Sequence, residues 1–238
     1  MEIYVLGSGS SGNAYLISDG KATLLLECGL PWKALQKALR YRVTAIDACL
    51  LTHEHMDHAK SAQHLADYGI KVYMSEGTKQ ALNAEEHNFR TFFIQAPCRY
   101  LSVAIKSFLI SPFHTIHDAA EPVGFLIQSQ KTGERLVFIT DSAYCQYRFT
   151  GIDFWMIEVN YVKSILDANT VDGAVNLNRR QRTVQSHMSL DTAVEMLRSS
   201  NASMAKVIYC VHLSDKNSDE EVIKRVMVES FGVPVVTC

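Results

Sequence analysis

The sequence lacks several features that would assign it to common classes of protein. Its six cysteines include no C-x-x-C pair, which gives no sign of a thiolate-rich zinc site. No apolar run approaches the roughly 18 to 20 residues needed to span a bilayer. The 23 basic residues do not outnumber the 25 acidic ones, and the net charge of -2 excludes a global basic field that would attract nucleic acid. Any affinity for phosphate must therefore be local.

Domain boundaries and targeting signals are also absent from the pattern. We find no internal repeat, low-complexity tract or linker that would divide the 238 residues. A hydrophobic content of 47% suffices for a sizeable core, so we expect a single domain over residues 1–238. The first residues resemble a strand and not a basic, apolar signal segment. Together with the scattered cysteines, this favours a cytoplasmic protein with reduced thiols.

A glycine-rich stretch, GSGSSG at residues 7–12, matches the G-x-G-x-x-G dinucleotide fingerprint. That fingerprint requires a strand before it, a helix after it and an acidic residue about 20 positions on. Glu27 lies at the right distance, but the chain after Gly12 consists of two β-rich runs around Asp19-Gly20, a dipeptide typical of hairpin turns. Without a helix N-terminus there is no site for pyrophosphate. We interpret the stretch as a flexible, amide-rich turn.

The remaining pattern predicts an α/β (α+β) protein. Helical periods are expected at 31–41, 59–69, 189–200 and 219–230, the last opened by a capping box of Ser218 and Glu221. Residues 160–186 are expected to be irregular and polar. Strands are expected at 2–6, 14–18, 22–27, 45–52, 71–74, 91–94, 106–110, 123–130, 135–140, 154–158 and 206–213. This order favours two β-sheets, each covered by helices on its outer face.

The most informative stretch is HEHMDH, residues 53–58, which directly follows an apolar strand. Three imidazoles and a carboxylate within six residues cannot all be buried without a positive partner, and a metal ion is such a partner. His53 and His55 are two residues apart on extended chain, so they project to the same side and can share one ion. The turn that follows directs Asp57 and His58 to a second position. The stretch therefore predicts two metal sites.

One loop cannot complete two coordination spheres, so further ligands are expected at strand ends, where a rigid sheet positions side chains. Four candidates stand at such strand-to-loop transitions, namely His114, His117, Asp141 and His212. Two other histidines have a different setting. His64 belongs to a helical period and His87 to a polar run, so both are expected at the surface.

These motifs resemble those of the metallo-β-lactamase superfamily over the whole chain. HEHMDH is its H-x-H-x-D-H signature, and HDAAEPVGF matches its H-D-A-x-x-P-V-G-F, which favours His117 over His114. The resemblance implies a four-layer αββα sandwich of two mixed β-sheets with outer helices, and a dinuclear site at one edge of the sheets. By this pattern Asp141 would bridge two metals, the first held by His53, His55 and His117 and the second by Asp57, His58 and His212.

Several short motifs resemble the WalJ (YycJ) branch of bacterial proteins, which is related to tRNase Z and to PhnP-type phosphodiesterases. These motifs are GSGSSGNAYLI, HDAAEPVGF, TDSAY, IEVNY, SHMSL and VHLSDKNS. The resemblance implies a metal-dependent phosphodiesterase, and most specifically a nuclease with 5′-to-3′ exonuclease activity on single-stranded nucleic acid. By the tRNase Z pattern, His187 would donate a proton to the leaving oxygen and Glu158 would orient it. Asp57 is a third candidate catalytic residue.

Candidate substrate-binding residues come from the basic run 178–182 and from two of these motifs. Guanidinium groups suit phosphate because their planar fork matches its oxygens, although a solvated loop is an equally good interpretation. The candidates are Arg179, Arg180, Arg182, Asn160 and Ser214.

Four residues depart from the pattern of the branch. Glu27 stands where aspartate is common, and we expect it to alter contacts around a metal-binding histidine and not to be a ligand. By the same resemblance, Tyr161, Ser186 and Ser218 stand in place of residues that would surround the substrate. They weaken the transfer of any particular substrate from the branch to this chain.

Other functions remain open at this point. A cyclic nucleotide phosphodiesterase of the phage anti-defence type is the alternative, because the net charge is near neutral and no RNA-gripping arm is evident. Hydrolysis of lactams, lactones or thioesters would leave Glu158 and His187 without a task. His55 argues against a di-iron oxygen reductase, and the complete ligand set argues against a binding module with a dead site. Two divalent metals are expected, zinc first and manganese or iron as alternatives. Nucleic acid or a nucleotide is the expected partner, with no membrane and with a homodimer as the assembly suggested by relatives.

Overall fold

The computed structural model of the protein describes residues 1–96 and 99–238, which divide into two compact units. Unit 1 comprises Met1–His114 and Ala119–Glu134, and unit 2 comprises Thr115–Asp118 and Arg135–Cys238. Cys98 lies outside the described residues. The five other cysteines are free thiols, as expected. The expectation of one domain over the whole chain stays a prediction.

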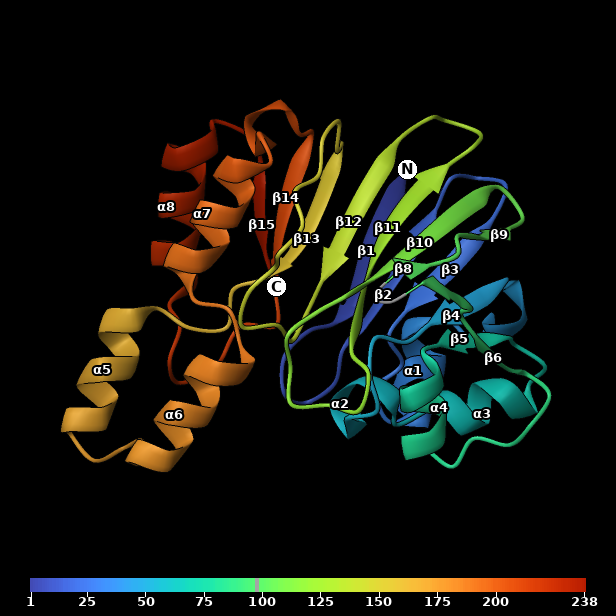
Figure 1. The fold of residues 1–238 in the computed structure, drawn as a ribbon, viewed down its shortest axis with the longest axis horizontal. Helices are drawn as coiled ribbons and strands as arrows, with labels where there is room; N and C mark the ends of the chain where they lie inside the picture. Colours follow the sequence, from blue (N-terminus) through green and yellow to red (C-terminus); the bar gives the residue numbers. More distant parts are fainter. Residues whose placement is uncertain (97–98) are drawn as a thin grey trace. The chain divides into compact units, whose positions relative to one another are not determined.

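Unit 1 is built on a mixed six-stranded sheet in the order β1 to β6 (Figure 1). The β1–β2 and β2–β3 pairs are antiparallel, and the pairs from β3 to β6 are parallel. The strands are β1 (Glu2–Gly7), β2 (Ala14–Ser18), β3 (Thr23–Leu26), β4 (Ala48–Leu50), β5 (Val72–Met74) and β6 (Phe89–Thr91). Because β3 and β4 run in parallel, their carboxyl ends meet at one edge, where the HEHMDH stretch begins.

The α-helices of unit 1 lie beside this sheet in Figure 1. They are α1 (Trp32–Ala38), α2 (Met56–Ala59), α3 (Ala62–Asp67) and α4 (Glu76–Ala81), with a 3₁₀ turn at Val43–Ala45. Leu35 of α1 and Leu65 of α3 are fully buried in one cluster with Leu25 and Val72 of the sheet. Burial of each such side chain stabilises the fold by roughly 1.5–3 kcal/mol. The helices therefore fix the strand ends from which the HEHMDH stretch leaves.

Further strands of unit 1 form an antiparallel group and a small pair. They are β7 (Ile94–Ala96), β8 (Arg99–Tyr100), β9 (Val103–Ile105), β10 (Phe108–His114) and β11 (Val123–Ser129). β10 pairs with β11 without a register shift, from Phe108 opposite Ser129 to His114 opposite Val123. The expected strand over residues 91–94 has the wrong bounds. Strand β6 ends at Thr91, and β7 begins at Ile94.

Unit 2 contains four parallel strands and four α-helices. The strands are β12 (Arg135–Ile139), β13 (Phe154–Glu158), β14 (Val207–Val211) and β15 (Val235–Thr237). The helices are α5 (Lys163–Val171), α6 (Leu177–Ser186), α7 (Leu190–Ser199) and α8 (Glu220–Phe231), with a 3₁₀ turn at Ala202–Met204. Figure 1 shows α7 and α8 side by side against β13 to β15. Because β12, β13 and β14 are parallel neighbours, their carboxyl ends lie next to one another.

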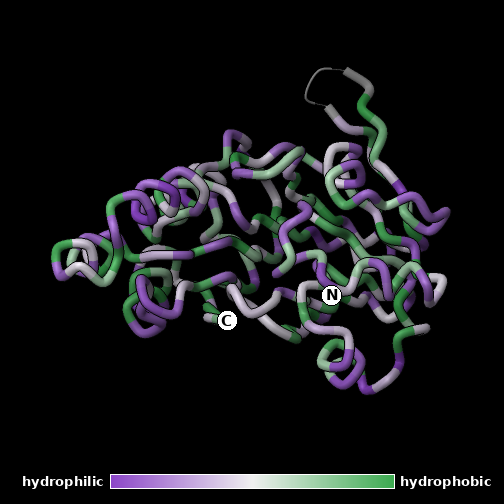
Figure 2. Tube along the Cα trace, turned by 90° about the horizontal axis from the view of Figure 1, so that it is seen from below, coloured by the Kyte–Doolittle hydropathy of each residue, from purple (hydrophilic) through white to green (hydrophobic). Residues whose placement is uncertain are grey.

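Helix α7 shows how a helix of unit 2 is specified. Ser189 caps it by accepting a hydrogen bond from the Thr192 amide, and the apolar residues Ala193, Val194 and Leu197 are buried on one face. In Figure 2 both hydrophilic and hydrophobic colours occur along the helical coils. Within the described residues, none of the helices is long and apolar enough to cross a membrane.

Two expectations in unit 2 are wrong. Residues 160–186 are not irregular, because α5 and α6 occupy most of that range. The hydrophobic pattern does not reveal α6, since Ser186 is its only fully buried residue among those described. The cap of α8 is Asp219, which accepts from the Val222 amide, while the Ser218 hydroxyl donates to the Ser214 carbonyl. The residue that caps α8 is therefore one position closer to the helix than Ser218, which the expected capping box used.

The glycine-rich stretch opens no helix. Within the described residues 7–14, the chain turns from β1 directly into the antiparallel strand β2. This confirms that GSGSSG is not a dinucleotide fingerprint.

Asp19 joins the β2–β3 turn to the end of β11. One carboxylate oxygen accepts hydrogen bonds from the Lys21 and Ala22 amides at 2.9 Å each, and the other accepts from the Ser129 hydroxyl at 2.7 Å. Burial alone would raise the pKa of Asp19, but the hydrogen bonds from Ser129 and Ala22 hold this pKa below its usual value. The ionised carboxylate is therefore the form that stabilises this junction.

We expect Asp19→Asn to lower the free energy of unfolding at pH 7 by about 1–3 kcal/mol, because an amide cannot accept with both of its polar atoms. A lowered pKa gives stability that is present above the unfolded value of 3.8 and is lost as pH falls through the folded value. In urea unfolding, the difference between wild type and variant should therefore be largest above about pH 5 and shrink below about pH 4. A difference that is constant between these conditions would contradict the assignment.

Candidate functional site

His53 and His55 lie together at the carboxyl end of β4 in unit 1. Nε2 of His53 is 3.1 Å from Nδ1 of His55, and Nδ1 of His53 is 2.9 Å from the Thr52 hydroxyl. His53 is buried, whereas His55 is half-buried. Two ring nitrogens thus face each other, which is the placement expected of two residues that share one ion.

Asp57 and His58 follow on the short helix α2. Nε2 of the fully buried His58 is 3.5 Å from a carboxylate oxygen of Asp57. The rings of His53 and His58 have centroids 4.3 Å apart. Unit 1 therefore brings all four candidate ligands of the HEHMDH stretch into one group.

Glu27 contacts this group from the end of β3. It is fully buried, its backbone is in the left-handed region with a φ of 61°, and one carboxylate oxygen accepts from the Thr52 amide at 3.2 Å. Its other oxygen lies 3.5 Å from Nδ1 of His58. As the sequence suggested, Glu27 lies beside a histidine of the metal motif, in the position from which a carboxylate can orient a metal-binding ring.

We expect Glu27→Gln to weaken metal affinity by about 10- to 100-fold, the usual effect of losing a carboxylate that orients a ligand histidine. Competition with a chelator, followed by elemental analysis, measures this directly. Glu27→Asp, which keeps the charge on a shorter side chain, serves as the matched control and should lose less. Unchanged affinity in a folded Glu27→Gln variant would show that the carboxylate has no such role.

Sequence reasoning missed Asn13 and Gly29, which hold the backbone of the metal motif. The Asn13 amide donates to the Asp57 carbonyl at 2.8 Å, and its side-chain nitrogen lies 3.2 Å from Nε2 of His58. A Cβ added to Gly29 would lie 1.6 Å from the Asp57 carbonyl oxygen. Residues 7–12 form a turn, as expected, with Ser10 and Ser11 exposed, while the end of the stretch at Gly12 and Asn13 is buried and packs against Gly29 and the metal motif. The glycine pattern was the sign of this role in the sequence, but we compared it only with the dinucleotide-binding fingerprint.

Unit 2 gathers side chains from the ends of three neighbouring parallel strands. Asp141 follows β12, Glu158 ends β13 and His212 follows β14. Nδ1 of His212 lies 3.0 Å from a carboxylate oxygen of Asp141 and 3.2 Å from one of Glu158. Asp141 and His212 both have left-handed backbones, with φ of 43° and 56°. Such conformations in residues other than glycine cost energy and concentrate at functional sites.

His187 completes this group through Glu158. Its Nδ1 lies 2.7 Å from Oε1 of Glu158, whose Oε2 accepts from the Ser142 and Met188 amides. Burial alone would raise the pKa of Glu158, but the positive charge of His187 lowers it. Burial likewise would lower the pKa of His187, but the Glu158 carboxylate raises it. Each member of the pair thus favours the charged form of the other, and Asp141, Glu158, His187 and His212 place one atom each within 4.8 Å of one another.

His117 also belongs to unit 2 and approaches Asp141. Its Nδ1 donates to the Ser186 carbonyl at 2.8 Å, which leaves Nε2, 3.4 Å from the Asp141 carboxylate, as the acceptor of a neutral ring. Burial lowers the pKa of His117, which favours this neutral, metal-binding form. His114 lies in unit 1, with its ring centroid 4.9 Å from that of Tyr100.

Asn160 and Ser214 support the segment after β14. The buried Asn160 side chain donates to the His212 carbonyl at 3.1 Å, and the Ser214 amide donates to the Asn160 carbonyl at 2.9 Å. The Ser214 hydroxyl accepts from the Asn217 amide at 3.3 Å. These contacts position His212, and contact of either residue with substrate stays a prediction.

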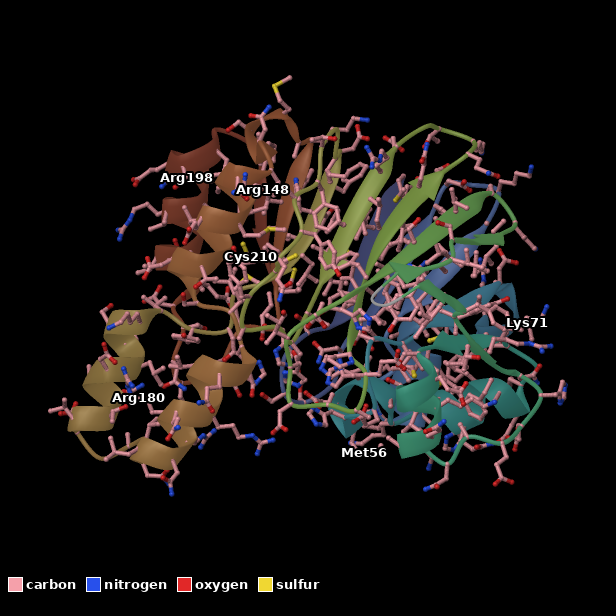
Figure 3. All side chains as sticks on the ribbon, viewed as in Figure 1. Met56, Lys71, Arg148, Arg180, Arg198 and Cys210 are labelled. Atoms are coloured by element: carbon pink, nitrogen blue, oxygen red, sulfur yellow. The ribbon has the colours of Figure 1, made fainter. Side chains whose placement is uncertain are left out.

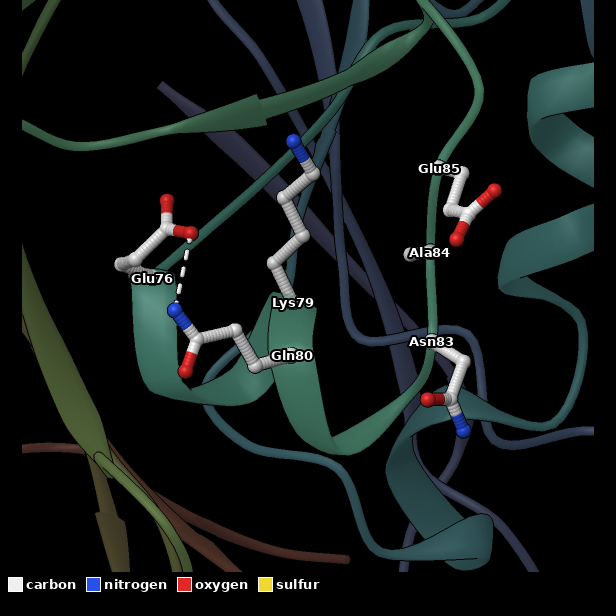
Figure 4. Close-up of a pocket in the computed structure, with 6 residues that line it drawn as sticks. All are labelled: Glu76, Lys79, Gln80, Asn83, Ala84 and Glu85. Carbon is white, nitrogen blue, oxygen red and sulfur yellow. Dashed lines mark hydrogen bonds between the residues drawn. The ribbon is translucent and has the colours of Figure 1, made fainter.

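The remaining candidates are distributed along the surface. His64 and His87 are exposed, as expected, and His64 stacks on Trp32. Arg179, Arg180 and Arg182 lie on α6, Arg180 half-buried and the other two exposed. A hollow beside α4 contains none of the candidate residues, and is lined by Glu76, Lys79, Gln80, Asn83, Ala84 and Glu85 (Figure 4).

Comparison with known proteins agrees with these motifs. A family model described as a β-lactamase superfamily domain matches residues 23–213. The exodeoxyribonuclease WalJ of Streptococcus pneumoniae (serotype 2, strain D39) is 30% identical over 243 residues, covering 96% of this chain and 87% of that protein. The chain therefore belongs to the β-lactamase superfamily, as the motifs predicted.

Solved structures agree on the fold. YhfI from Bacillus subtilis, a metallo-β-lactamase fold protein, has a TM-score of 0.74 at 18% identity, covering 99% of this chain and 95% of that one. The short form of human tRNase Z has a TM-score of 0.68 at 16% identity, with coverage of 100% and 96%. The predicted α/β class and metallo-β-lactamase fold are confirmed. This fold, with its clusters of histidine and aspartate, fits the binding of divalent metal.

Proposed function

We propose that the protein is a dinuclear metal-dependent phosphodiesterase that hydrolyses nucleic acid, specifically a 5′-to-3′ exonuclease on single strands. The observation on which this depends is the 2.7 Å contact between His187 and Glu158, in one group with Asp141 and His212. Cleavage of a phosphodiester requires a group that gives a proton to the leaving oxygen. A protonated imidazole that lies beside carboxylate and imidazole groups can do this. The name of the Streptococcus pneumoniae relative, exodeoxyribonuclease, gives the substrate class.

The proposed metal ligands draw on both units. Within unit 1 the 3.1 Å contact of His53 with His55 supports a shared ion, and within unit 2 the 3.0 Å contact of Asp141 with His212 supports a second. When bound, two divalent ions would make a water molecule acidic enough to attack and would neutralise charge that develops on the phosphate. Zinc is proposed first, because imidazole and carboxylate suit it, and manganese or iron fit the same donors. The first ion would be held by His53, His55 and His117 and the second by Asp57, His58 and His212, with Asp141 as the bridge.

The chain's own side chains would move and hold the proton. His187 would give its proton to the leaving oxygen, and Glu158 would keep the ring oriented and protonated near neutral pH. Asp57 is proposed as a catalytic residue as well as a ligand. A cytoplasmic location and a homodimer are part of the proposal.

A comparison of substrates tests the proposal. Metal-loaded protein should hydrolyse bis(p-nitrophenyl) phosphate and shorten 3′-labelled single-stranded DNA from its 5′ end, with little turnover of nitrocefin. Turnover of nitrocefin without cleavage of any phosphodiester would contradict the proposal. Faster hydrolysis of cyclic mononucleotides than of DNA would instead assign a cyclic nucleotide phosphodiesterase.

A further inference from the structure

Helices α5 and α6 follow each other in the chain and form a hairpin, residues 163–186 (Figure 1). The hairpin concentrates positive charge directly before His187 in the chain. Four of its residues are basic and two are acidic, and α6 contains three arginines and no acidic residue, in a protein with a net charge of -2. Its own core is small, since Leu166 and Val175 form a buried cluster with Tyr161. The sequence showed no such arm, because α6 is mostly polar and its only apolar residues are Leu177 and Val184.

Arg180 has a structural task in this hairpin. Its Nε and Nη2 donate to the same carboxylate oxygen of Asp167 on α5, at 3.1 and 2.6 Å. Figure 3 labels Arg180 where α5 and α6 face each other. Lys163 donates to the other oxygen of Asp167 at 2.7 Å. The guanidinium of Arg180 thus clamps the two helices together and is not available as a free phosphate ligand.

Arg179 and Arg182 lie on a different face of α6. They are three residues apart and therefore neighbours on one face, which Ser186 continues at the end of the helix. Among residues 1–96 and 99–238, the Arg179 guanidinium has no ion pair or hydrogen bond. Arg182 lies 3.7 Å from Asp118, and both side chains are 69% exposed. Such an exposed, long ion pair contributes little energy, so phosphate can displace it.

This face leads to the candidate proton donor. The carbonyl of Ser186 accepts from Nδ1 of His117, and Asp118, the partner of Arg182, is the next residue in the chain. At a rise of 1.5 Å per residue, Arg182 and Arg179 stand about 7.5 and 12 Å from His187 along the helix axis. A strand that extends from His187 along α6 would therefore meet Arg182 first and Arg179 next.

We propose that the α5–α6 hairpin is a phosphate-binding arm for single-stranded nucleic acid, on which Arg182 and Arg179 bind successive backbone phosphates while Arg180 holds the arm together. This inference rests on the proposed function and deepens it. The phosphates bound would be those of the part of the strand that remains after cleavage at His187. Binding through backbone phosphate is independent of base sequence and depends on salt.

The salt dependence of binding tests the arm. We expect the double variant Arg179→Ala/Arg182→Ala, as full-length protein, to bind a phosphorothioate single-stranded DNA with a slope of log K against log salt reduced by about 1.4, or 0.7 for each lost contact. The ratio of turnover of DNA to turnover of bis(p-nitrophenyl) phosphate should fall about tenfold, since only DNA reaches the arm. Arg225→Ala, an exposed arginine on α8 of the same unit, is the matched control and should keep the wild-type slope.

A second measurement separates the clamp from the phosphate ligands. In protein without DNA, Arg180→Ala should speed amide hydrogen exchange in α5 and α6, whereas Arg179→Ala should not. A double variant with the same slope as Arg225→Ala, in protein that still degrades DNA, overturns the arm and leaves the proposed function standing. Failure of wild type to hydrolyse any phosphodiester overturns the proposed function, and a reduced slope in the double variant would still support the arm.

Discussion

Replacing His187 by alanine is expected to lower kcat for single-stranded DNA by about 10²- to 10⁴-fold, the usual contribution of a positioned proton donor. Nδ1 of His187 is occupied by Glu158 at 2.7 Å, so Nε2 is the nitrogen from which a proton can be given. His187 is not a proposed metal ligand, and the variant should therefore bind as much metal as wild type. Steady-state assays together with elemental analysis measure both quantities.

The leaving group distinguishes a proton donor from a residue that only supports the structure. A p-nitrophenolate leaves readily without a proton, whereas the alkoxide of a sugar does not. The loss in His187→Ala should therefore be much smaller with bis(p-nitrophenyl) phosphate than with DNA. Glu158→Gln, which can still accept a hydrogen bond but has no charge, should lose less than His187→Ala with DNA. Equal losses on both substrates, or no loss on DNA, would contradict the role of His187.

Replacing Gly29 by alanine should release the metal and destabilise the fold. The new Cβ would lie 1.6 Å from the Asp57 carbonyl oxygen and 2.7 Å from the His58 amide, so the backbone of both residues must move. Overpacking of this kind costs about 1–3 kcal/mol, and a shift of about 1 Å misplaces ligands that must converge on one ion. We expect loss of most bound metal and of phosphodiesterase activity, together with a lower midpoint in urea unfolding.

A second glycine supplies the control for this experiment. A Cβ at Gly69 would meet no atom of the described residues within 4 Å, although the φ of 80° strains any residue other than glycine. Gly69→Ala should therefore lose about 1 kcal/mol of stability through strain and keep its metal. If Gly29→Ala kept both its metal and its activity, the close packing of Gly29 against the metal motif would have no functional role.

Much of the fold followed from local patterns. Alternating and apolar runs predicted most strands, because the side-chain period of a strand is a local property. The α5–α6 hairpin was missed because α6 lacks the apolar residues from which such a local pattern is made. Helix α6 contains only two apolar residues, Leu177 and Val184, both exposed, and it buries only Ser186 among the described residues, while polar capping by Asn176 starts it. The basic run that we interpreted as a loop is therefore a helix with two distinct arginine faces.

The candidate site divides in the same way. Residue types and strand ends alone predicted HEHMDH, Asp141 and His212 as candidate metal ligands, because donor chemistry and position at the end of a strand can be seen in the sequence. Only the tertiary structure decided that Asn13 holds the backbone of Asp57, 44 positions away, that Gly29 leaves room for it, and that Arg180 pairs with Asp167. Such contacts join distant segments, and they depend on the close packing of the folded chain, which no local pattern specifies.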